Sequence, residues 1–237
     1  MRLAQVRRIL KKQGNKKKAR LLQGFFKTGP GEYAEGDIFF GITVPELRCL
    51  AKQCQGLSLE DVLKLLKSAI HEERFLALLL LMFQYQEADP IGKKRIYQAY
   101  LAHTHYINNW DLVDVTAKHI VGDYLYDKDR MPLYRLAHSS HLWERRIAVL
   151  STFHFIGKGE FQDSLKISRI LLSDPHELIH KAVGWMLREV GKRHKALLER
   201  FLRRHAAKMP RVMLRYAIEK FPARQRKDYL RMTTCVK

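Results

Sequence analysis

The sequence predicts an all-α protein made of HEAT-like helical repeats that stack into a right-handed superhelix, or solenoid. Three observations support this fold class. Apolar residues recur with the period of a helix, alternating strand patterns and Asn-Gly or Asp-Gly hairpin signals are absent, and related segments return at intervals of 31 to 40 residues. We therefore expect one continuous domain over residues 1–237, with a concave basic groove along the stack.

The N-terminal part of the chain predicts basic helices around one long loop. The run KKQGNKKKAR at 11–20 is by default a solvated helix end, and it is also suited to contacting phosphates. Residues 24–41, GFFKTGPGEYAEGDIFFG, are rich in glycine and predict a loop between helices. The next segment, DVLKLLKSAI at 61–70, returns to helical periodicity.

A repeated pattern organises the rest of the chain. In each copy a basic residue is followed within three positions by a small alanine and then by a helical apolar series. The copies are HEERFLALLLLMF (71–83), LWERRIAVLSTFHF (142–155), LIHKAVGWMLREV (178–190) and VMLRYAIEKF (212–221), with alanines Ala77, Ala148, Ala182 and Ala217, while Ala117 fills the remaining interval. LLERFLRRHAAKM at 197–209 is a further helical segment. This spacing is typical of stacked helix pairs.

The composition indicates a polyanionic partner. Lys and Arg number 44 against 24 Asp and Glu, a formal net charge of +20. This excess favours nucleic acid, with an anionic membrane surface as the second possibility. The longest apolar run, FLALLLLMF (75–83), is too short to span a bilayer, and the N-terminus lacks a signal-peptide hydrophobic region. Three cysteines without metal spacing favour free thiols, so we expect a soluble cytoplasmic protein.

The three tryptophans, Trp110, Trp143 and Trp185, are separated by 33 and 42 residues, close to the repeat period. At equivalent repeat positions they would line one side of the stack. The simpler interpretation places them in the interhelical core. Trp110 differs from the other two because Asn108, Asn109 and Asp111 surround it with polar groups, as expected at an exposed helix start.

The segment NNWDLVDV at 108–115 has two interpretations. Asp111 as N-cap with Asp114 at N3 would form a capping-box-like pair, which makes Asp114 structural. Alternatively Asn108 or Asn109 caps the helix. Asp114 then projects beside Trp110, four residues away on the same helix face, and stabilises developing positive charge. Spacing alone leaves both open.

HELIH at 176–180 matches the H-E-x-x-H zinc motif. We interpret it instead as a helix start, with Asp174 as N-cap, Pro175 at N1 and Glu177 at N3. A third ligand at a recognisable spacing is missing, so we expect no metal. Basic residues also recur in ERR (144–146), LRE (187–189), GKR (191–193) and FLRRH (201–205). Some of them cover helices with their stems, and together they favour a basic stripe for phosphate contact.

Four segments carry a family resemblance that covers essentially the whole chain. FFKTGPGEYAEGDIFFGITVPELR (25–48), NNWDLVDVTAKHIVGDYL (108–125), LWERRIAVL (142–150) and HKAVGWMLREVGKR (180–193) occur in the order found in AlkD-type DNA alkylation repair enzymes. The chain resembles this family of HEAT-like repeat DNA glycosylases. The resemblance implies a monofunctional base-excision-repair hydrolase that removes cationic N3- and N7-alkylated purines from double-stranded DNA without a cofactor. A monomer is expected.

The resemblance also implies roles for single residues. The family's catalytic aspartate matches Asp114, its two sugar-flanking tryptophans match Trp110 and Trp185, and its active-site arginine matches Arg146. Further DNA contacts are expected from the same segments, namely Arg188, Arg145, Lys181, Lys192, Arg193, Thr43 and Lys27. Some relatives have a glutamine where Thr43 stands, which leaves its contribution open. A non-catalytic HEAT-like module that binds damaged or branched DNA is the alternative function.

Overall fold

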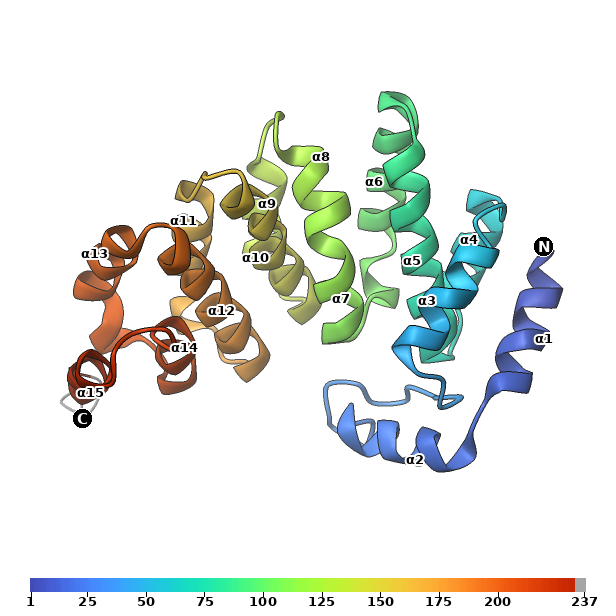
Figure 1. The fold of residues 1–237 in the computed structure, drawn as a ribbon, viewed down its shortest axis with the longest axis horizontal. Helices are drawn as coiled ribbons and strands as arrows, with labels where there is room; N and C mark the ends of the chain where they lie inside the picture. Colours follow the sequence, from blue (N-terminus) through green and yellow to red (C-terminus); the bar gives the residue numbers. More distant parts are fainter. Residues whose placement is uncertain (233–237) are drawn as a thin grey trace. The chain divides into compact units, whose positions relative to one another are not determined.

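The computed structural model describes residues 1–232, and these residues form an all-α repeat fold (Figure 1). β pairing within this part of the chain is limited to one parallel bridge between Ile38 and Ile70. Contacts divide the chain into two compact units, Met1–Thr116 and Ala117–Lys237, and each is described on its own. None of the helices in the described part is both long and apolar enough to cross a bilayer.

The first unit contains seven α-helices and a long loop within its described residues. The helices are α1 (Leu3–Gln13), α2 (Lys16–Phe25), α3 (Val44–Gln53), α4 (Leu59–Leu66), α5 (His71–Glu87), α6 (Pro90–Ala102) and α7 (Trp110–Ala117), with a 3-10 turn at Thr104–Tyr106. Helix α5 forms the centre, because nearly all of its residues are buried and it packs against α3, α4 and α6. The predicted loop is confirmed between Phe25 and Val44.

The second unit is a stack of helix pairs. A π-helical turn at Lys118–Gly122 is followed by α8 (Asp123–Leu125), α9 (Met131–Ala137), α10 (Leu142–Gly157), α11 (Gln162–Ile170), α12 (Glu177–Arg193), α13 (Lys195–His205), α14 (Arg211–Ala217) and α15 (Ala223–Met232). Short 3-10 turns lie at Leu171–Ser173 and Ala206–Lys208. Helices α10, α12 and α14 pack in series, while α9, α11 and α13 cover them as the other member of each pair.

The recurring alanines lie on the packed faces of the repeats. Ala77, Ala117, Ala148, Ala182 and Ala217 are all buried. Glycines serve the same purpose where helices approach more closely. A Cβ on Gly122 would collide with the backbone oxygen of Ser151, and one on Gly184 would lie 2.5 Å from that of Met213. Small residues therefore set the spacing between neighbouring helices of the stack.

The three tryptophans do not occupy equivalent positions, and the core interpretation holds for Trp143. Trp110 begins α7 and Trp143 lies in the first turn of α10, whereas Trp185 lies in the middle of α12. Trp143 is buried in the core, while Trp110 and Trp185 are half-buried. The residue spacing resembled the repeat period because the loops between the helices differ in length.

Candidate functional site

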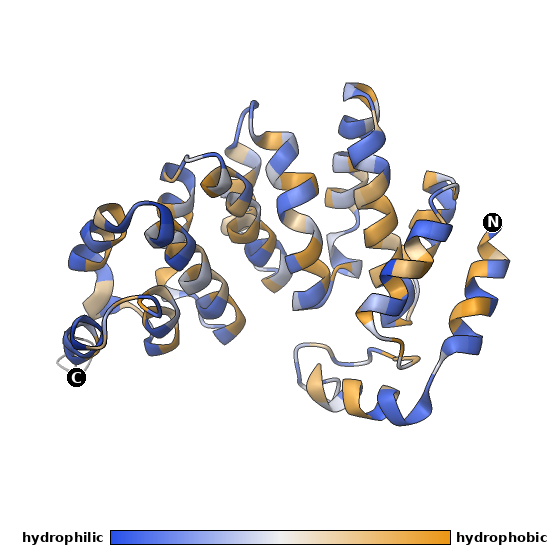
Figure 2. Ribbon diagram, viewed as in Figure 1, coloured by the Kyte–Doolittle hydropathy of each residue, from blue (hydrophilic) through white to orange (hydrophobic). Residues whose placement is uncertain are grey.

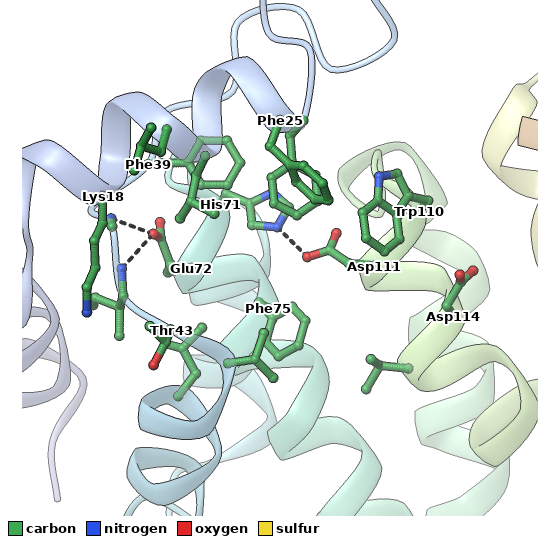
Figure 3. A pocket seen from close by; sticks show the side chains of 18 residues that line it. Lys18, Phe25, Phe39, Thr43, His71, Glu72, Phe75, Trp110, Asp111 and Asp114 are labelled. Atoms are coloured by element: carbon green, nitrogen blue, oxygen red, sulfur yellow. Dashed lines mark hydrogen bonds and ion pairs between the residues drawn. The ribbon is translucent and has the colours of Figure 1, made fainter.

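Residues of the first unit line a pocket of about 540 Å³ that includes Trp110, Asp111 and Asp114 (Figure 3). Its walls come from α2, the loop before α3, and helices α3, α5 and α7, and most of the lining is apolar. The other lining residues are Lys18, Leu21, Leu22, Phe25, Phe26, Phe39, Gly41, Ile42, Thr43, Val44, Leu47, His71, Glu72, Phe75 and Val115.

Helix α2 forms a wall with little packing of its own. Its sequence, KKKARLLQGF, begins basic and ends apolar, a division that Figure 2 shows along the helix. None of its residues is buried, and Leu21 and Phe25 are 69% and 63% exposed. Exposed apolar side chains at a pocket rim are a feature of binding surfaces.

The start of α7 tests which residue of NNWDLVDV caps the helix. Helix α7 begins at Trp110, the carbonyl of Asn109 accepts the first helical hydrogen bond from Val113 N–H, and Asn109 Oδ1 accepts from Trp110 N–H at 2.8 Å. Asp111 is therefore inside the helix, and the predicted N-cap role of Asp111 is wrong. The physical reason is that one oxygen of its carboxylate accepts a hydrogen bond from His71.

His71, at the start of α5, joins two carboxylates in the interior. Its Nε2 lies 2.8 Å from Asp111 Oδ2, and its Nδ1 lies 3.1 Å from Asp37 Oδ2. Burial alone would lower the pKa of His71, but the charge and hydrogen bond of Asp111, with the hydrogen bond of Asp37, raise it to about 9. The ring is thus an imidazolium at neutral pH and donates from both nitrogens.

Asp37 is held by two further donors. Arg74 Nη2 donates to Asp37 Oδ1 at 2.6 Å, and Asn108 Nδ2 donates to the same oxygen at 3.1 Å. Burial works to raise the pKa of Asp37, yet the His71 hydrogen bond and the Arg74 charge bring it below its ordinary value. Buried charges need such partners, because an unpaired one costs several kcal/mol. The cluster ties α5, the loop and α7 together.

Glu72, the neighbour of His71, fixes the same loop. Its buried carboxylate accepts backbone N–H bonds from Phe40 at 2.9 Å, Gly41 at 2.7 Å and Ile42 at 3.2 Å. Gly41 has φ +85°, and a Cβ there would collide with the backbone oxygen of Asn15. Only glycine readily adopts this positive φ and also leaves room for the backbone of Asn15. The loop before α3 is therefore held in one conformation.

A stack of rings sets the orientation of Trp110. The Phe39 ring lies over His71 with centroids 4.5 Å apart, Phe26 stacks on Phe39 at 5.2 Å, and Trp110 stacks on Phe26 at 5.2 Å. Phe25 contacts the Trp110 ring edge-on at 5.9 Å. Asp111 points toward His71, whereas Asp114 lies one helical turn further along α7 at the pocket wall (Figure 3). Trp110 and Asp114 therefore stand on a braced helix start.

The other predicted residue of the pocket is Thr43, which caps α3. Its hydroxyl donates to the Glu46 carboxylate at 2.6 Å, and Glu46 also accepts from the Thr43 N–H at 2.7 Å. This capping box commits the side chain to the helix start. Lys27 lies on the exposed loop with φ +54° and outside the pocket lining.

The remaining predicted residues lie in the second unit. Trp185, Arg188, Lys181 and Lys192 are all on α12, at spacings that place them along one helix face. The Trp185 ring contacts Phe153 edge-on with centroids 5.7 Å apart. Charge pairs restrain the cations, because Arg188 binds Glu219, Lys181 binds Glu177, and both Lys192 and Arg193 bind Glu189. Glu189 has a lowered pKa in spite of its burial, owing mainly to Lys192 and Arg193.

Helix α10 carries the two predicted arginines, in different settings. Arg146 is only 4% exposed, and its Nη1 donates to the Leu178 carbonyl at the start of α12. Arg145 donates from Nε to Asp174 at 2.6 Å and from Nη1 to the carbonyls of Ser139 and Ser140. Arg145 thus joins two loops, an arrangement that accounts for it without DNA.

The HELIH segment starts a helix, but with other residues than predicted. Helix α12 begins at Glu177, and the N-cap is His176, whose Nδ1 accepts from Leu178 N–H. The proposed capping by Asp174 is wrong, because its carboxylate binds Arg145 and the His176 N–H. His180 Nε2 donates to the Asp174 carbonyl. In the described part of the chain no three His, Cys, Asp or Glu side chains are grouped to hold a metal ion.

The prediction of one basic stripe is wrong for FLRRH, because this segment lies on α13, in the other layer from α10 and α12. The cluster around His71 was also missed. Its signal was the dense charge of His71, Glu72, Glu73 and Arg74 directly before a strongly apolar series, where such residues need buried partners.

Cys49 and Cys54 are free thiols, and Cys235 lies outside the described residues.

Comparison with known proteins identifies the family. The model of the DNA alkylation repair enzyme family matches residues 6–221. A solved structure described as a predicted DNA alkylation repair enzyme from Enterococcus faecalis superposes with a TM-score of 0.68 at 17% identity, over 89% of this chain and 98% of that one.

Two Streptococcus mutans structures, smu.31 and AlkD2, give TM-scores of 0.47 and 0.48 at 18% identity. Each covers 99% of this chain, with 98% and 99% of their own chains matched. No curated protein sequence matches. The E. faecalis structure agrees with the all-α repeat fold, and the family match spans nearly the whole sequence. The chain therefore belongs to the DNA alkylation repair enzyme family.

Proposed function

We propose that this protein is a monofunctional DNA glycosylase that hydrolyses the N-glycosidic bond of N3- or N7-alkylated purines in duplex DNA. Family membership supports a role in DNA alkylation repair. The observation that carries the proposal is the placement of Asp114 and Trp110, four residues apart, on a helix start braced by buried charges at the wall of an apolar pocket.

The chemistry requires little more than a well-placed carboxylate. An N3- or N7-alkylpurine is already cationic, so it leaves as a neutral base without a strong general acid. The bond breaks toward an oxocarbenium-like sugar, as in glycoside hydrolysis. Asp114 stabilises this developing charge and positions the attacking water, while the face of Trp110 contacts the sugar. Asp111 binds His71, and we assign the catalytic role to Asp114 because it lies at the pocket wall beside Trp110 on the same helix.

We assign the second unit the recognition of the DNA backbone. Trp185 supplies a second aromatic face, and Arg188, Lys181 and Lys192 on the same face of α12 contact phosphates. Arg146 contacts a backbone phosphate, with its guanidinium oriented by the Leu178 carbonyl. Arg193 and Lys27 are secondary candidates for phosphate contact. Thr43 and Arg145 support the site indirectly, because Thr43 caps α3 and Arg145 joins two loops.

The decisive experiment measures release of 7-methylguanine and 3-methyladenine from methylated duplex DNA. Asp114→Asn keeps the size of the side chain and removes its charge, so the rate should fall ~10²–10³-fold, as for other single electrostatic stabilisers. Asp127→Asn, at an exposed position after α8, is the matched control and should retain the wild-type rate. Circular dichroism and DNA affinity verify that both variants fold and bind.

Each result has a definite meaning. Loss of release in Asp114→Asn alone supports the glycosylase and its key carboxylate. No release by the wild type, with DNA binding intact, would favour the non-catalytic module that binds damaged DNA. Equal release by wild type and Asp114→Asn would return Asp114 to a structural role.

A further inference from the structure

A second hollow, of about 300 Å³, lies between α11 and α13 of the second unit and is lined by basic side chains. We call it the α11–α13 basic pocket. None of its residues has a role in the proposed function above, although three of them belong to the FLRRH segment. Its basic residues are Lys166, Arg169, Arg200, Arg204 and His205, and its apolar residues are Leu165, Leu197 and Phe201. Among the residues that the structure describes, no acidic side chain lines this pocket.

Helical spacing makes the charges converge. Lys166 and Arg169 are three residues apart on α11, and Arg200 and Arg204 are four apart on α13, so each pair shares one face of its helix. Like charges at these spacings destabilise a helix. The two pairs of like charges therefore lower the stability of the free protein.

Neighbouring carboxylates do not offset these charges. Within the part of the chain that the structure describes, none of the five basic residues forms an ion pair or side-chain hydrogen bond with a carboxylate. Acidic groups on or next to the two helices have other partners, since Glu160 and Asp163 both bind Arg130 at 2.7 Å, and Glu199 pairs with Lys195 at 3.6 Å. The pocket therefore keeps an uncompensated positive potential.

The pocket opens away from α12. On α13 the buried residues Leu198, Phe201 and Leu202 face the interior, with Leu198 against Gly191 of α12. Arg200 and Arg204 lie on the exposed side of the same helix. The pocket and the α12 face that carries Trp185 are accordingly separate surfaces of one unit.

The pKa of His205 is lowered in the same surroundings. Burial lowers the pKa of His205, and the charges of Arg169, Arg204 and Lys208 lower it further. His205 is therefore neutral at pH 7 in the free protein. A bound anion would offset the repulsion between the cationic groups and raise the pKa of His205.

We propose that the α11–α13 basic pocket binds phosphates of a nucleic-acid backbone and gives the protein a second DNA contact, apart from the α12 face. Guanidinium groups suit this ligand because they bind phosphate oxygens through two parallel N–H bonds. The apolar floor positions the arginine stems while their ends stay in water. A protein with two such surfaces can hold two duplex segments at once.

A bridging assay tests the proposal without relying on glycosylase activity. Beads carry an unmodified biotinylated duplex, wild-type protein is bound, and a second fluorescent duplex is added. Wild-type protein should retain the second duplex. Arg169→Gln/Arg204→Gln should weaken that capture at least ~10-fold and lower the steepness of its salt dependence by about two phosphate contacts, while affinity for the first duplex changes little.

The matched control removes two exposed charges elsewhere in the unit. Arg135→Gln/Lys227→Gln should bridge as the wild type does. Equal loss in both double variants would mean that net charge alone matters, and the proposal would be wrong. It would also be wrong if Arg169→Gln/Arg204→Gln bridged normally, or if the wild type captured no second duplex.

Two further measurements distinguish DNA bridging from self-association and from lipid binding. Sedimentation of the DNA-free protein shows whether the protein forms dimers, and bridging that appears only with protein dimers would overturn the proposal. Phosphatidylglycerol vesicles test a membrane surface as the source of phosphate. If the arginine pair were needed for vesicle binding but not for bridging, the pocket would serve lipids and not nucleic acid.

Discussion

His71 should make the stability of the first unit depend on pH in an unusual range. An unfolded histidine titrates near pH 6.5, whereas the pKa of folded His71 is about 9. The folded state binds the proton more tightly, so the stabilisation is complete below pH 6.5 and is lost as pH rises through about 9. At 1.36 kcal/mol per pKa unit, the difference amounts to about 3 kcal/mol.

The assay is urea unfolding at pH 6 and pH 9.5, for the wild type and for His71→Gln. Between these pH values the free energy of unfolding of the wild type should fall by about 3 kcal/mol more than that of the variant. The comparison removes contributions from the other histidines and from net charge, which both proteins share. NMR of the His71 ring protons provides a direct check, with a midpoint near pH 9.

Parallel pH profiles for the two proteins, or a His71 midpoint near 6.5, would refute the buried imidazolium. A confirmed midpoint has a functional consequence. Because His71 holds Asp111 at the start of α7, its deprotonation should loosen the support of Trp110 and Asp114. Glycosylase activity should then fall above pH 9 in the wild type.

Three further predictions concern the loop, the helix stack and DNA binding. Glu72→Gln should destabilise the protein by about 1–3 kcal/mol, because three backbone N–H groups lose a charged acceptor. The control Glu87→Gln, on the exposed end of α5, should change stability by less than about 0.5 kcal/mol. Urea unfolding measures both variants. Gly184→Ala places a Cβ 2.6 Å from Tyr216 Cβ and should cost about 1–3 kcal/mol, while Gly157→Ala has open space and should be neutral or slightly stabilising in thermal unfolding. Affinity for unmodified duplex should fall ~10³–10⁵-fold between 50 and 200 mM salt if about 6–10 phosphates are contacted, and a flat response in a binding titration would contradict the DNA-binding role.

Local sequence determined most of the helices and their repeat. The periodicity of HEERFLALLLLMF depends on residues three and four apart, so α5 is readable without knowledge of the fold. The buried alanines followed from the same pattern. The loop around Gly41 was also predictable, because glycine density marks turns. Trp110 and Asp114 were singled out by their spacing on one helix and by the family motif.

Only tertiary structure decided which polar residues meet. His71 is 34 residues from Asp37 and 40 from Asp111, and no local pattern encodes contacts at such separations. The same applies to Arg145, whose partner Asp174 is 29 residues away in the sequence. Charged side chains look alike along a sequence, and burial with a partner is what separates a structural charge from a binding one. Periodicity reports which face of a helix is buried, whereas packing between distant helices determines what that face buries and which charges it leaves for a ligand.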